Sequence, residues 1–512
     1  MFRKFLLTGL TLFLISGCGG GSSSYLSGST GTGGSSSSSG ATTSYYLPYL
    51  GSVELVDCSS PTSPVKLVEG DVDEAELFST SSSIDLAGGA YSDYHPTYLV
   101  YILNGKVYRL SVIKGSSLPR PEEVSGIDDA CSFKEGEHDM DTDRAYLIVE
   151  TAGADGDCAT TGDNGEALVD VQNLKAQNLG SKRFITFLPD GSYRITHALF
   201  IDTASLTPEV CELPQLSNCR AIPLPKVVQS SPNYLLAGVS VYRHSKGRFE
   251  HFYCLDFGSG GELYGWDGSQ MSLLTGGDCS GWTAMSADEE RVYGTDGSKI
   301  YSYSNGSLNE IVSGVGDIQS IGILGNYLIY LSSSSTLTGG LSFSLGYYDV
   351  RDGTLGSIDN GVVPPYLTAD KKVFYIKSDG TSSTACYWPA SESSLSPVCF
   401  TNSYWAGFTR KPSGTVDSMI KGLLLVKKGS EEDTLYFVEP ENLDNESAWR
   451  FLGTVDTNVA LGFYGVGNCL LGQGVNSQAD NEDVYFVDTD RENSLVNITD
   501  TPSEDEEVVF ME

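Results

Sequence analysis

Short runs of alternating apolar and polar residues fill most of the chain, and turn residues separate them. Val, Ile, Tyr and Phe dominate the runs, while Gly, Ser, Asn and Asp lie between them. This pattern is typical of β-strands joined by tight turns. Residues 98–103 and 106–112, for example, are two alternating runs on either side of Asn104-Gly105. Because Asn-Gly favours the tight turn of a β-hairpin, we predict a hairpin here and an all-β fold with little helix.

Two sequence patterns recur along the chain. The first is an acidic or polar turn that leads into an apolar strand, at residues 140–149, 286–293 and 368–376. The second is an aromatic strand followed by a polar turn, and it first appears near Ile300. From there its starts lie roughly 40 to 50 residues apart, which is the length of a four-stranded propeller blade. The repeat therefore predicts one β-propeller domain over residues 45–512.

At these residues the chain resembles β-propellers of the TolB and WD40-like kind, whose blades often begin with a Ser-x-Asp-Gly turn. The glycine of that turn is missing from the first pattern, and no Trp-Asp dipeptide recurs. The resemblance implies a single ring of about 465 residues, with eight blades or with seven blades and insertions. Regular strand spacing also fits a pair of β-sandwiches, which is the alternative fold.

The N-terminal residues carry the pattern of an export signal. Two basic residues precede the apolar residues 5–14, and Ile-Ser-Gly-Cys follows at residues 15–18. These parts are typical of a signal peptide, here residues 1–17. The last four resemble the lipobox of bacterial lipoproteins, which implies cleavage before Cys18 and a lipid on its thiol. The alternatives are an ordinary secretory signal and an uncleaved membrane anchor, for which the apolar run is short.

Composition adds a tether and a strong acidic charge. Residues 18–44 are almost entirely Gly, Ser and Thr after the cysteine, a composition that forms a flexible coil. The chain has 31 basic and 66 acidic residues, a net charge of −35. Loss of the two basic residues of the signal gives 29 − 66 = −37. This charge disfavours phosphate backbones, so we do not expect nucleic acid as a partner.

The cysteines are consistent with an oxidising compartment. Eleven cysteines less the lipidated one leave an even number, which reads as up to five disulfides in an exported chain. Sequence cannot choose among the many connectivities, but proximity along the chain favours four local pairs and one that joins the ends of the domain. The pairs are Cys131 with Cys158, Cys211 with Cys219, Cys254 with Cys279, Cys386 with Cys399, and Cys58 with Cys469.

One acidic segment is a candidate calcium loop. Asp155, Asp157, Asp163 and Glu166 occupy the first, third, ninth and twelfth positions of an EF-hand pattern. The glycine of that pattern is missing and the flanks read as strands, so no EF-hand is predicted and the segment reads first as a solvated hairpin tip closed by a disulfide. A calcium loop of another design is the alternative. No other cofactor is predicted.

Signs of enzymatic chemistry are few. The five histidines are His95, His138, His197, His244 and His251, and none lies in an HExxH motif. No GxSxG elbow or P-loop occurs either. With so many acidic residues, chance pairs of carboxylates are guaranteed, and no single pair identifies a glycoside hydrolase. The tryptophans could stack on sugars or peptides, although such side chains more often pack between blades.

These features together predict a lipid-anchored binding or scaffold protein of the bacterial cell envelope, without catalytic activity. Gly19 follows the cysteine, and in the lipoproteins that the chain resembles the absence of Asp there favours the outer membrane. The membrane is contacted through the lipid, and an envelope protein or a glycan is the expected ligand. The alternative is an extracytoplasmic hydrolase acting on polysaccharide or peptide, with acidic residues at the propeller channel.

Overall fold

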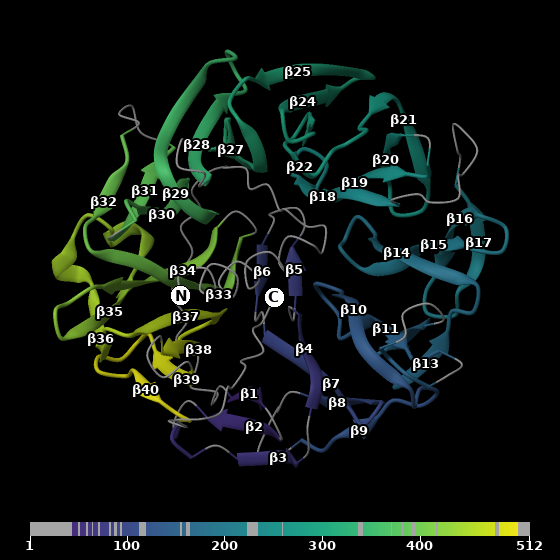
Figure 1. Cartoon of the computed structure of the whole chain (residues 1–512). Helices are drawn as coiled ribbons and strands as arrows, with labels where there is room; N and C mark the ends of the chain where they lie inside the picture. The colour runs from purple at the N-terminus through teal and green to yellow at the C-terminus, as the bar shows by residue number, and fades with distance from the viewer. Residues whose placement is uncertain are drawn as a thin grey trace.

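The computed structural model describes most of the chain beyond the predicted tether. The described residues are 44–49, 52–57, 60–63, 65–69, 72–80, 83–85, 90–92, 95–111, 119–153, 156–159, 164–222, 234–258, 260–335, 341–369, 371–380, 382–390, 396–415, 418–476 and 481–499. They form antiparallel sheets arranged around a common centre (Figure 1). Cys18 and the lipobox lie outside the described residues.

Four consecutive four-stranded sheets follow the chain in strict sequence order. The first sheet contains β10 (Ala130–His138), β11 (Ala145–Thr151), β12 (Gly165–Asp170) and β13 (Lys175–Asn178), and the second contains β14 (Lys182–Pro189), β15 (Ile195–Asp202), β16 (Thr207–Glu212) and β17 (Ser217–Ala221). The third contains β18 (Leu235–Arg243), β19 (Arg248–Asp256), β20 (Gly261–Trp266) and β21 (Met271–Asp278). The fourth contains β22 (Ala284–Ala287), β23 (Val292–Thr295), β24 (Lys299–Ser304) and β25 (Ser307–Ser313). In each of the first three sheets the first strand lies nearest the centre (Figure 1).

The C-terminal half contains two larger sheets. The seven strands of one are β26 (Asp317–Leu324), β27 (Tyr327–Ser335), β28 (Leu341–Asp349), β29 (Leu355–Ala369), β30 (Lys372–Ser378), β31 (Ser383–Pro389) and β32 (Val398–Phe400). The other contains β33 (Ser403–Thr415), β34 (Ser418–Lys427), β35 (Glu432–Val438), β36 (Arg450–Asp456), β37 (Val459–Val466), β38 (Cys469–Asn476), β39 (Asn481–Asp488) and β40 (Val496–Asn497). Two short 3₁₀ turns, η1 (Pro440–Asn442) and η2 (Glu446–Ala448), lie between β35 and β36.

The N-terminal strands form two further sheets and a hairpin at the centre. The sheets contain β1 (Ser44–Tyr49), β2 (Ser52–Asp57) and β3 (Val65–Glu69), and β4 (Val72–Thr80), β7 (His95–Leu103), β8 (Lys106–Ser111) and β9 (Glu122–Glu123). The hairpin of β5 (Ser83–Asp85) and β6 (Ala90–Ser92) interrupts the second sheet and pairs with the end of β33. Figure 1 shows this hairpin at the centre of the ring.

The predicted hairpin at Asn104-Gly105 is confirmed. Strands β7 and β8 pair through Leu103 and Lys106, and the two turn residues have φ values of 53° and 73°. Both values are positive, as the tight hairpin turn requires, and Asn and Gly adopt such values most readily. The local sequence therefore fixes the turn and the register of the two strands.

Both faces of most sheets are buried because neighbouring sheets pack face to face. On β11, the side chains of Tyr146 and Ile148 pack with Phe184 and Phe200 of the next sheet, whereas Leu147 and Val149 pack toward the preceding one. This two-sided burial explains the continuous apolar runs in the sequence. It is also the packing that a ring of blades requires.

Glycine allows aromatic rings to lie flat on a neighbouring strand. A Cβ added at Gly294 of β23 would lie 1.9 Å from the Trp282 ring, and Trp282 is 2 % exposed. The ring therefore occupies the space of the missing side chain. Such aromatic and glycine pairs compensate for the poor strand propensity of glycine.

The four local disulfides suggested by proximity along the chain are present. They are Cys131–Cys158, Cys211–Cys219, Cys254–Cys279 and Cys386–Cys399. Cys469 is also disulfide-bonded, but Cys58 lies outside the described residues, so its pairing stays a prediction.

The architecture is all-β and consistent with a β-propeller, as the repeat predicted. The sheets follow one another around a centre, as blades do (Figure 1), whereas a pair of β-sandwiches would stack them two by two. The number of blades, eight or seven, stays a prediction. Among the described residues, no helix is long and apolar enough to cross a membrane.

Candidate functional site

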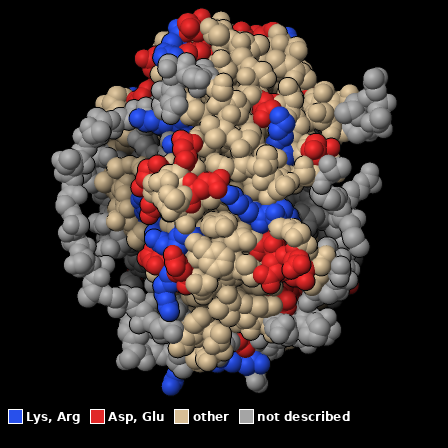
Figure 2. Space-filling view, turned by 90° about the vertical axis from the view of Figure 1, so that its left-hand side faces the viewer, with Lys and Arg blue, Asp and Glu red and all other residues tan. Residues whose placement is uncertain are grey.

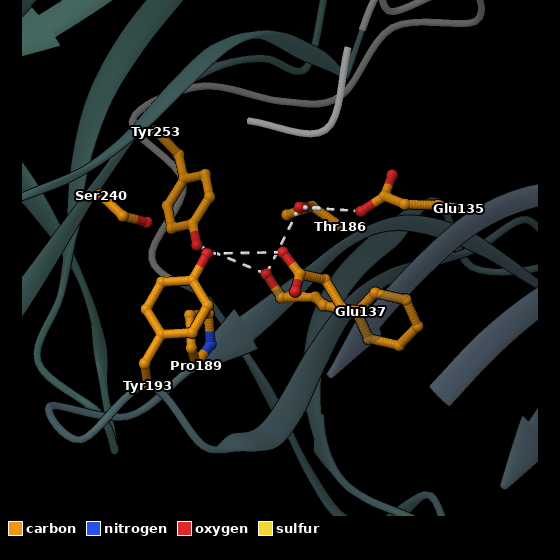
Figure 3. Close-up of a pocket in the computed structure, with 8 residues that line it drawn as sticks. Glu135, Glu137, Thr186, Pro189, Tyr193, Ser240 and Tyr253 are labelled. Atoms are coloured by element: carbon orange, nitrogen blue, oxygen red, sulfur yellow. Dashed lines mark hydrogen bonds between the residues drawn. The ribbon is translucent and has the colours of Figure 1, made fainter. Parts of the chain in front are cut away.

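A small polar cavity lies where the innermost strands of three neighbouring sheets meet. Strands β10, β14, β18 and β19 supply most of its wall, and the turn after β14 supplies the rest (Figure 3). Its volume is about 20 Å³, which is room for one water molecule or an ion of similar size. The lining residues are Glu135, Glu137, Thr186, Phe187, Pro189, Tyr193, Ser240 and Tyr253.

Two carboxylates form one side of the cavity. Glu135 and Glu137 are two residues apart on β10, so their side chains leave the same face of the strand. Gly136, between them, has no side chain, and a Cβ there would lie 2.1 Å from the Glu76 carboxylate of β4. On the same strand, Glu74 accepts a hydrogen bond from the backbone of β10. Four glutamates therefore gather on two neighbouring strands.

Hydroxyl groups form the opposite side. Thr186 Oγ1 lies 3.5 Å from Glu135 Oε1, and the Tyr193 hydroxyl lies 3.5 Å from Glu137 Oε1. The Tyr253 hydroxyl donates to the Phe187 carbonyl at 3.4 Å. Figure 3 shows the Thr186 and Tyr193 hydroxyl groups turned toward the two carboxylates. Every polar side-chain atom of the lining residues is therefore an oxygen.

The two glutamates compete for ionisation. Burial, and then the charge of Glu137, raise the pKa of the Glu135 carboxyl to about 8. The charge of Glu137, together with burial, also holds the pKa of the Tyr193 hydroxyl well above its usual value. The Glu135 carboxyl therefore keeps its proton at neutral pH.

A histidine lies directly behind the cavity. His251 of β19 is opposite Ser240 of β18 in the strand register, and its Nδ1 lies 2.7 Å from the Ser240 hydroxyl. Its Nε2 lies 3.2 Å from the Asp190 carbonyl. The ring is 1 % exposed, and burial lowers the pKa of His251 to about 4. The ring is therefore neutral at neutral pH.

The remaining histidines do not join the cavity. His138 follows Glu137 on β10, and burial, together with the charge of Arg410, lowers its pKa to about 4. His244 lies in the turn before β19, where its backbone N–H donates to Glu289 Oε1 at 2.7 Å. His197 packs edge-on against Trp266. The side chain of His95 lies outside the described residues.

The candidate calcium loop is described only in part. Asp155 and Asp163 lie outside the described residues. Asp157 is exposed and accepts the backbone N–H of Ala159 at 2.9 Å. Glu166 is 6 % exposed, and its carboxylate contacts Lys134 Nζ at 2.6 Å and the Phe184 N–H at 2.8 Å. The Glu166 carboxylate is thus held against the neighbouring sheet by a cation and a backbone donor, and the calcium loop stays a prediction.

Two groups of ligand-type residues contain disulfides. They are Glu209 with Cys211 and Cys219, and Asp359 with Cys386 and Cys399. In both groups the two sulfur atoms are bonded to each other. Since metal ions bind the thiolate form, neither group is a metal centre in this state.

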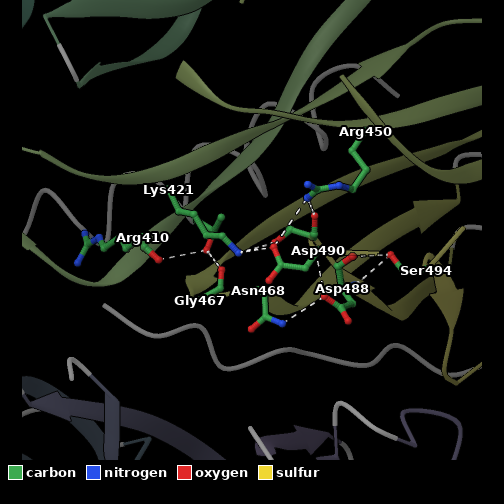
Figure 4. Close-up of polar contacts among 10 residues, drawn as sticks. Arg410, Lys421, Arg450, Gly467, Asn468, Asp488, Asp490 and Ser494 are labelled. Atoms are coloured by element: carbon green, nitrogen blue, oxygen red, sulfur yellow. Dashed lines mark hydrogen bonds and ion pairs between the residues drawn. The ribbon is translucent and has the colours of Figure 1, made fainter. Parts of the chain in front are cut away.

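A second polar cluster joins strands β34 and β36 to the turn that follows β39. Lys421 Nζ contacts Asp490 Oδ1 at 2.9 Å, and the Arg450 guanidinium lies 3.8 Å from the same oxygen (Figure 4). The two cations lie over the Phe437 ring. The cluster fixes the turn after β39 against β34 and β36. Asp490 is 55 % exposed, and we interpret this cluster as a structural clamp.

Surface charge and aromatic residues do not mark a second site. Figure 2 shows one face on which acidic side chains gather in several groups, with Lys and Arg between them. Trp266, Trp282, Trp388 and Trp449 are all at most 8 % exposed. These four rings pack largely in the core.

Comparison with known proteins shows distant structural similarity alone. No protein-family model and no curated protein matches the sequence. Tricorn protease is similar over 88 % of this chain at 10 % identity with a TM-score of 0.31, and the chain spans 52 % of its length. The β-propeller domain of the Trilobed protease from Pyrococcus furiosus matches 61 % of this chain and 94 % of that domain, at 11 % identity and a TM-score of 0.30. AztD from Citrobacter koseri matches 70 % and 97 % of the two chains, at 10 % identity and a TM-score of 0.32.

Proposed function

We propose that the protein is a lipid-anchored binding protein of the bacterial cell envelope, and that its central cavity holds a small cation. The cation is a hard metal ion such as calcium, or the ammonium end of a larger ligand. The lipobox supports the anchor, and the ring of sheets supports a binding role because its innermost strands converge on one place. An envelope protein or a glycan that carries such a group would dock at this point.

The paired carboxylates in an oxygen-lined cavity carry the proposal. Burial, and then the charge of Glu137, raise the pKa of Glu135 to about 8. A cation beside Glu135 and Glu137 would offset their negative charge and displace the proton of Glu135. Hard cations prefer oxygen ligands. The polar side-chain atoms of the lining residues are all oxygens. The volume of about 20 Å³ also suits an ion.

Calorimetry with the purified full chain would test the binding. We would titrate calcium, magnesium, sodium and methylammonium chlorides into the protein near pH 8. A matched control is Glu123→Gln on β9, an exposed glutamate paired with Lys106. Binding of at least one cation, lost in Glu137→Gln and kept in the control, is the expected result. Equal binding by the two variants would refute the cavity as the site.

The alternative function is a hydrolase with the two glutamates as acid and base. One observation favours it: Glu135 keeps its proton at neutral pH beside Glu137, as a general acid must. The volume of the cavity opposes it, because a sugar ring or a peptide bond with its substituents needs far more space. Turnover of a glycan or peptide library, abolished by Glu135→Gln, would establish the hydrolase instead.

The lipid anchor is tested by a separate substitution. Cys18→Ala removes the thiol that would carry the lipid, and we expect the protein to move from the membrane fraction to the soluble fraction. Several acyl chains make anchoring effectively permanent, at about 0.8 kcal/mol for each buried methylene. An unchanged distribution between the two fractions would refute lipidation at this cysteine.

A further inference from the structure

A chain of hydrogen bonds leads from the cavity to a backbone carbonyl. The Tyr193 hydroxyl lies 3.5 Å from Glu137, and the Ser240 hydroxyl is within reach of the same tyrosine. The Ser240 hydroxyl in turn contacts His251 Nδ1 at 2.7 Å, and His251 Nε2 contacts the Asp190 carbonyl at 3.2 Å. Tyr193 and Ser240 line the cavity, whereas His251 lies behind it.

The carbonyl determines the tautomer of the histidine. A carbonyl oxygen can only accept, so His251 Nε2 must carry the proton. That carbonyl is fixed in place, since it also accepts the Tyr193 backbone N–H at 2.9 Å. In the neutral ring, Nδ1 then has a free lone pair and must accept. The short contact to Ser240 therefore uses the single proton of the serine hydroxyl.

The direction of this proton decides what the serine presents to the cavity. With its proton on the side of His251, Ser240 turns oxygen lone pairs toward the cavity and the Tyr193 hydroxyl. Without an acceptor behind it, the same hydroxyl would be free to point its proton into the cavity. A proton there would repel a cation and attract a neutral or anionic guest.

We infer that His251 is a positioning residue that determines the specificity of the cavity for cations. It acts through Ser240, by holding the serine proton away from the guest. The inference rests on the proposed cation binding. Outer residues that orient metal ligands typically change metal affinity by 10-fold to 100-fold when they are replaced.

Three substitutions at His251 separate this role from a general packing role. His251→Asn places an amide oxygen near the position of Nδ1, so an acceptor for Ser240 is kept. His251→Gln reaches the Asp190 carbonyl but leaves no acceptor near Ser240, and His251→Leu supplies neither group. We expect calcium or methylammonium affinity to be kept by the asparagine and to fall about 10-fold to 100-fold in the other two.

A double-mutant cycle with Ser240→Ala provides the decisive readout. Ser240→Ala alone removes the hydroxyl and weakens binding. If His251 acts through the serine, adding His251→Leu to Ser240→Ala costs no further affinity. If the histidine is merely structural, the second substitution lowers affinity again, and the inference is overturned. Affinities that are equal in His251→Asn, His251→Gln and His251→Leu would also overturn it.

The outcome is distinguishable from failure of the proposed function. If the wild-type protein binds none of the cations, the proposed function fails before the histidine is tested. If the wild type binds and Glu137→Gln does not, the cavity is the site, and the His251 variants then decide the inference alone. Circular dichroism and thermal unfolding of each variant show whether the fold is kept.

Discussion

The stability of the protein should depend on pH through Glu135. Its carboxyl has an ordinary pKa of 4.5 in the unfolded chain and a pKa of about 8 in the folded protein. Between these two values the unfolded chain has lost a proton that the folded protein still holds. The free energy of unfolding therefore falls as pH rises across this window, and the contribution of Glu135 to stability is complete only below pH 4.5.

The magnitude follows from the shift in pKa. Each pKa unit corresponds to about 1.36 kcal/mol, so Glu135 should lower the free energy of unfolding by about 4 kcal/mol between pH 5 and pH 9. Glu135→Gln keeps the shape of the side chain but cannot ionise. The variant should lose this part of the pH dependence. Its free energy of unfolding should therefore increase relative to that of the wild type as pH rises.

Chemical denaturation at pH 5 and at pH 9 measures the effect. The quantity to compare is the wild-type minus Glu135→Gln difference in unfolding free energy, because pH effects from other groups cancel in it. Glu123→Gln, at an exposed position on β9, is the control, and its difference should not change with pH. A Glu135 difference that stays constant within about 0.5 kcal/mol across this range would refute the reasoning.

Calcium provides a second check on the same carboxyl. If a cation binds between Glu135 and Glu137, it should restore stability at pH 9 in the wild type, since a ligand that binds only the folded state stabilises it. The Glu135→Gln variant should respond much less. A similar calcium response in both proteins would place the ion elsewhere.

Substitutions at a packed glycine and at a disulfide test two further sources of stability. Gly294→Ala should destabilise the protein by about 1 to 3 kcal/mol because its Cβ would overlap the Trp282 ring. Gly462→Ala, where no atom lies within 4 Å of the added Cβ, should have a much smaller effect, and equal losses in denaturation would contradict the argument. Replacing both Cys254 and Cys279 by Ala removes a disulfide that spans 25 residues. The loss should be about 3 kcal/mol, and unchanged stability under non-reducing conditions would refute it.

Local features of the sequence predicted the fold well. The turn at Asn104-Gly105 needs only two residues to set its geometry, and the structure places β7 and β8 on either side of it. The disulfide pair Cys386 and Cys399 lies on adjacent strands β31 and β32, so a short separation in sequence is also a short distance in space. Such features depend on neighbours along the chain, and sequence contains that information directly.

The cavity was missed because its residues come from different repeats. Glu135, Thr186 and Ser240 lie on β10, β14 and β18, the innermost strands of consecutive sheets. Nothing close to any of them in sequence marks it as functional. The acidic loop shows how little closeness in sequence says about closeness in space: Glu166 is near other acidic residues in sequence, and its carboxylate pairs with Lys134 and accepts the Phe184 N–H of the next sheet.

One signal in the sequence could have located the cavity. Glu135, Thr186, Ser240 and Ser286 occupy corresponding innermost strands and follow one another by roughly one blade length. Since a ring of blades brings equivalent positions of successive repeats toward the same centre, polar residues that recur at this position are candidates to line it, as Glu135, Thr186 and Ser240 do. Ser286 is fully buried, and no hydrogen-bond partner of its hydroxyl is found among the described residues. A polar residue retained in an otherwise apolar inner strand is costly unless something pairs with it. The position within the repeat, more than local acidity, is therefore the feature that identifies candidate ligand contacts in this chain.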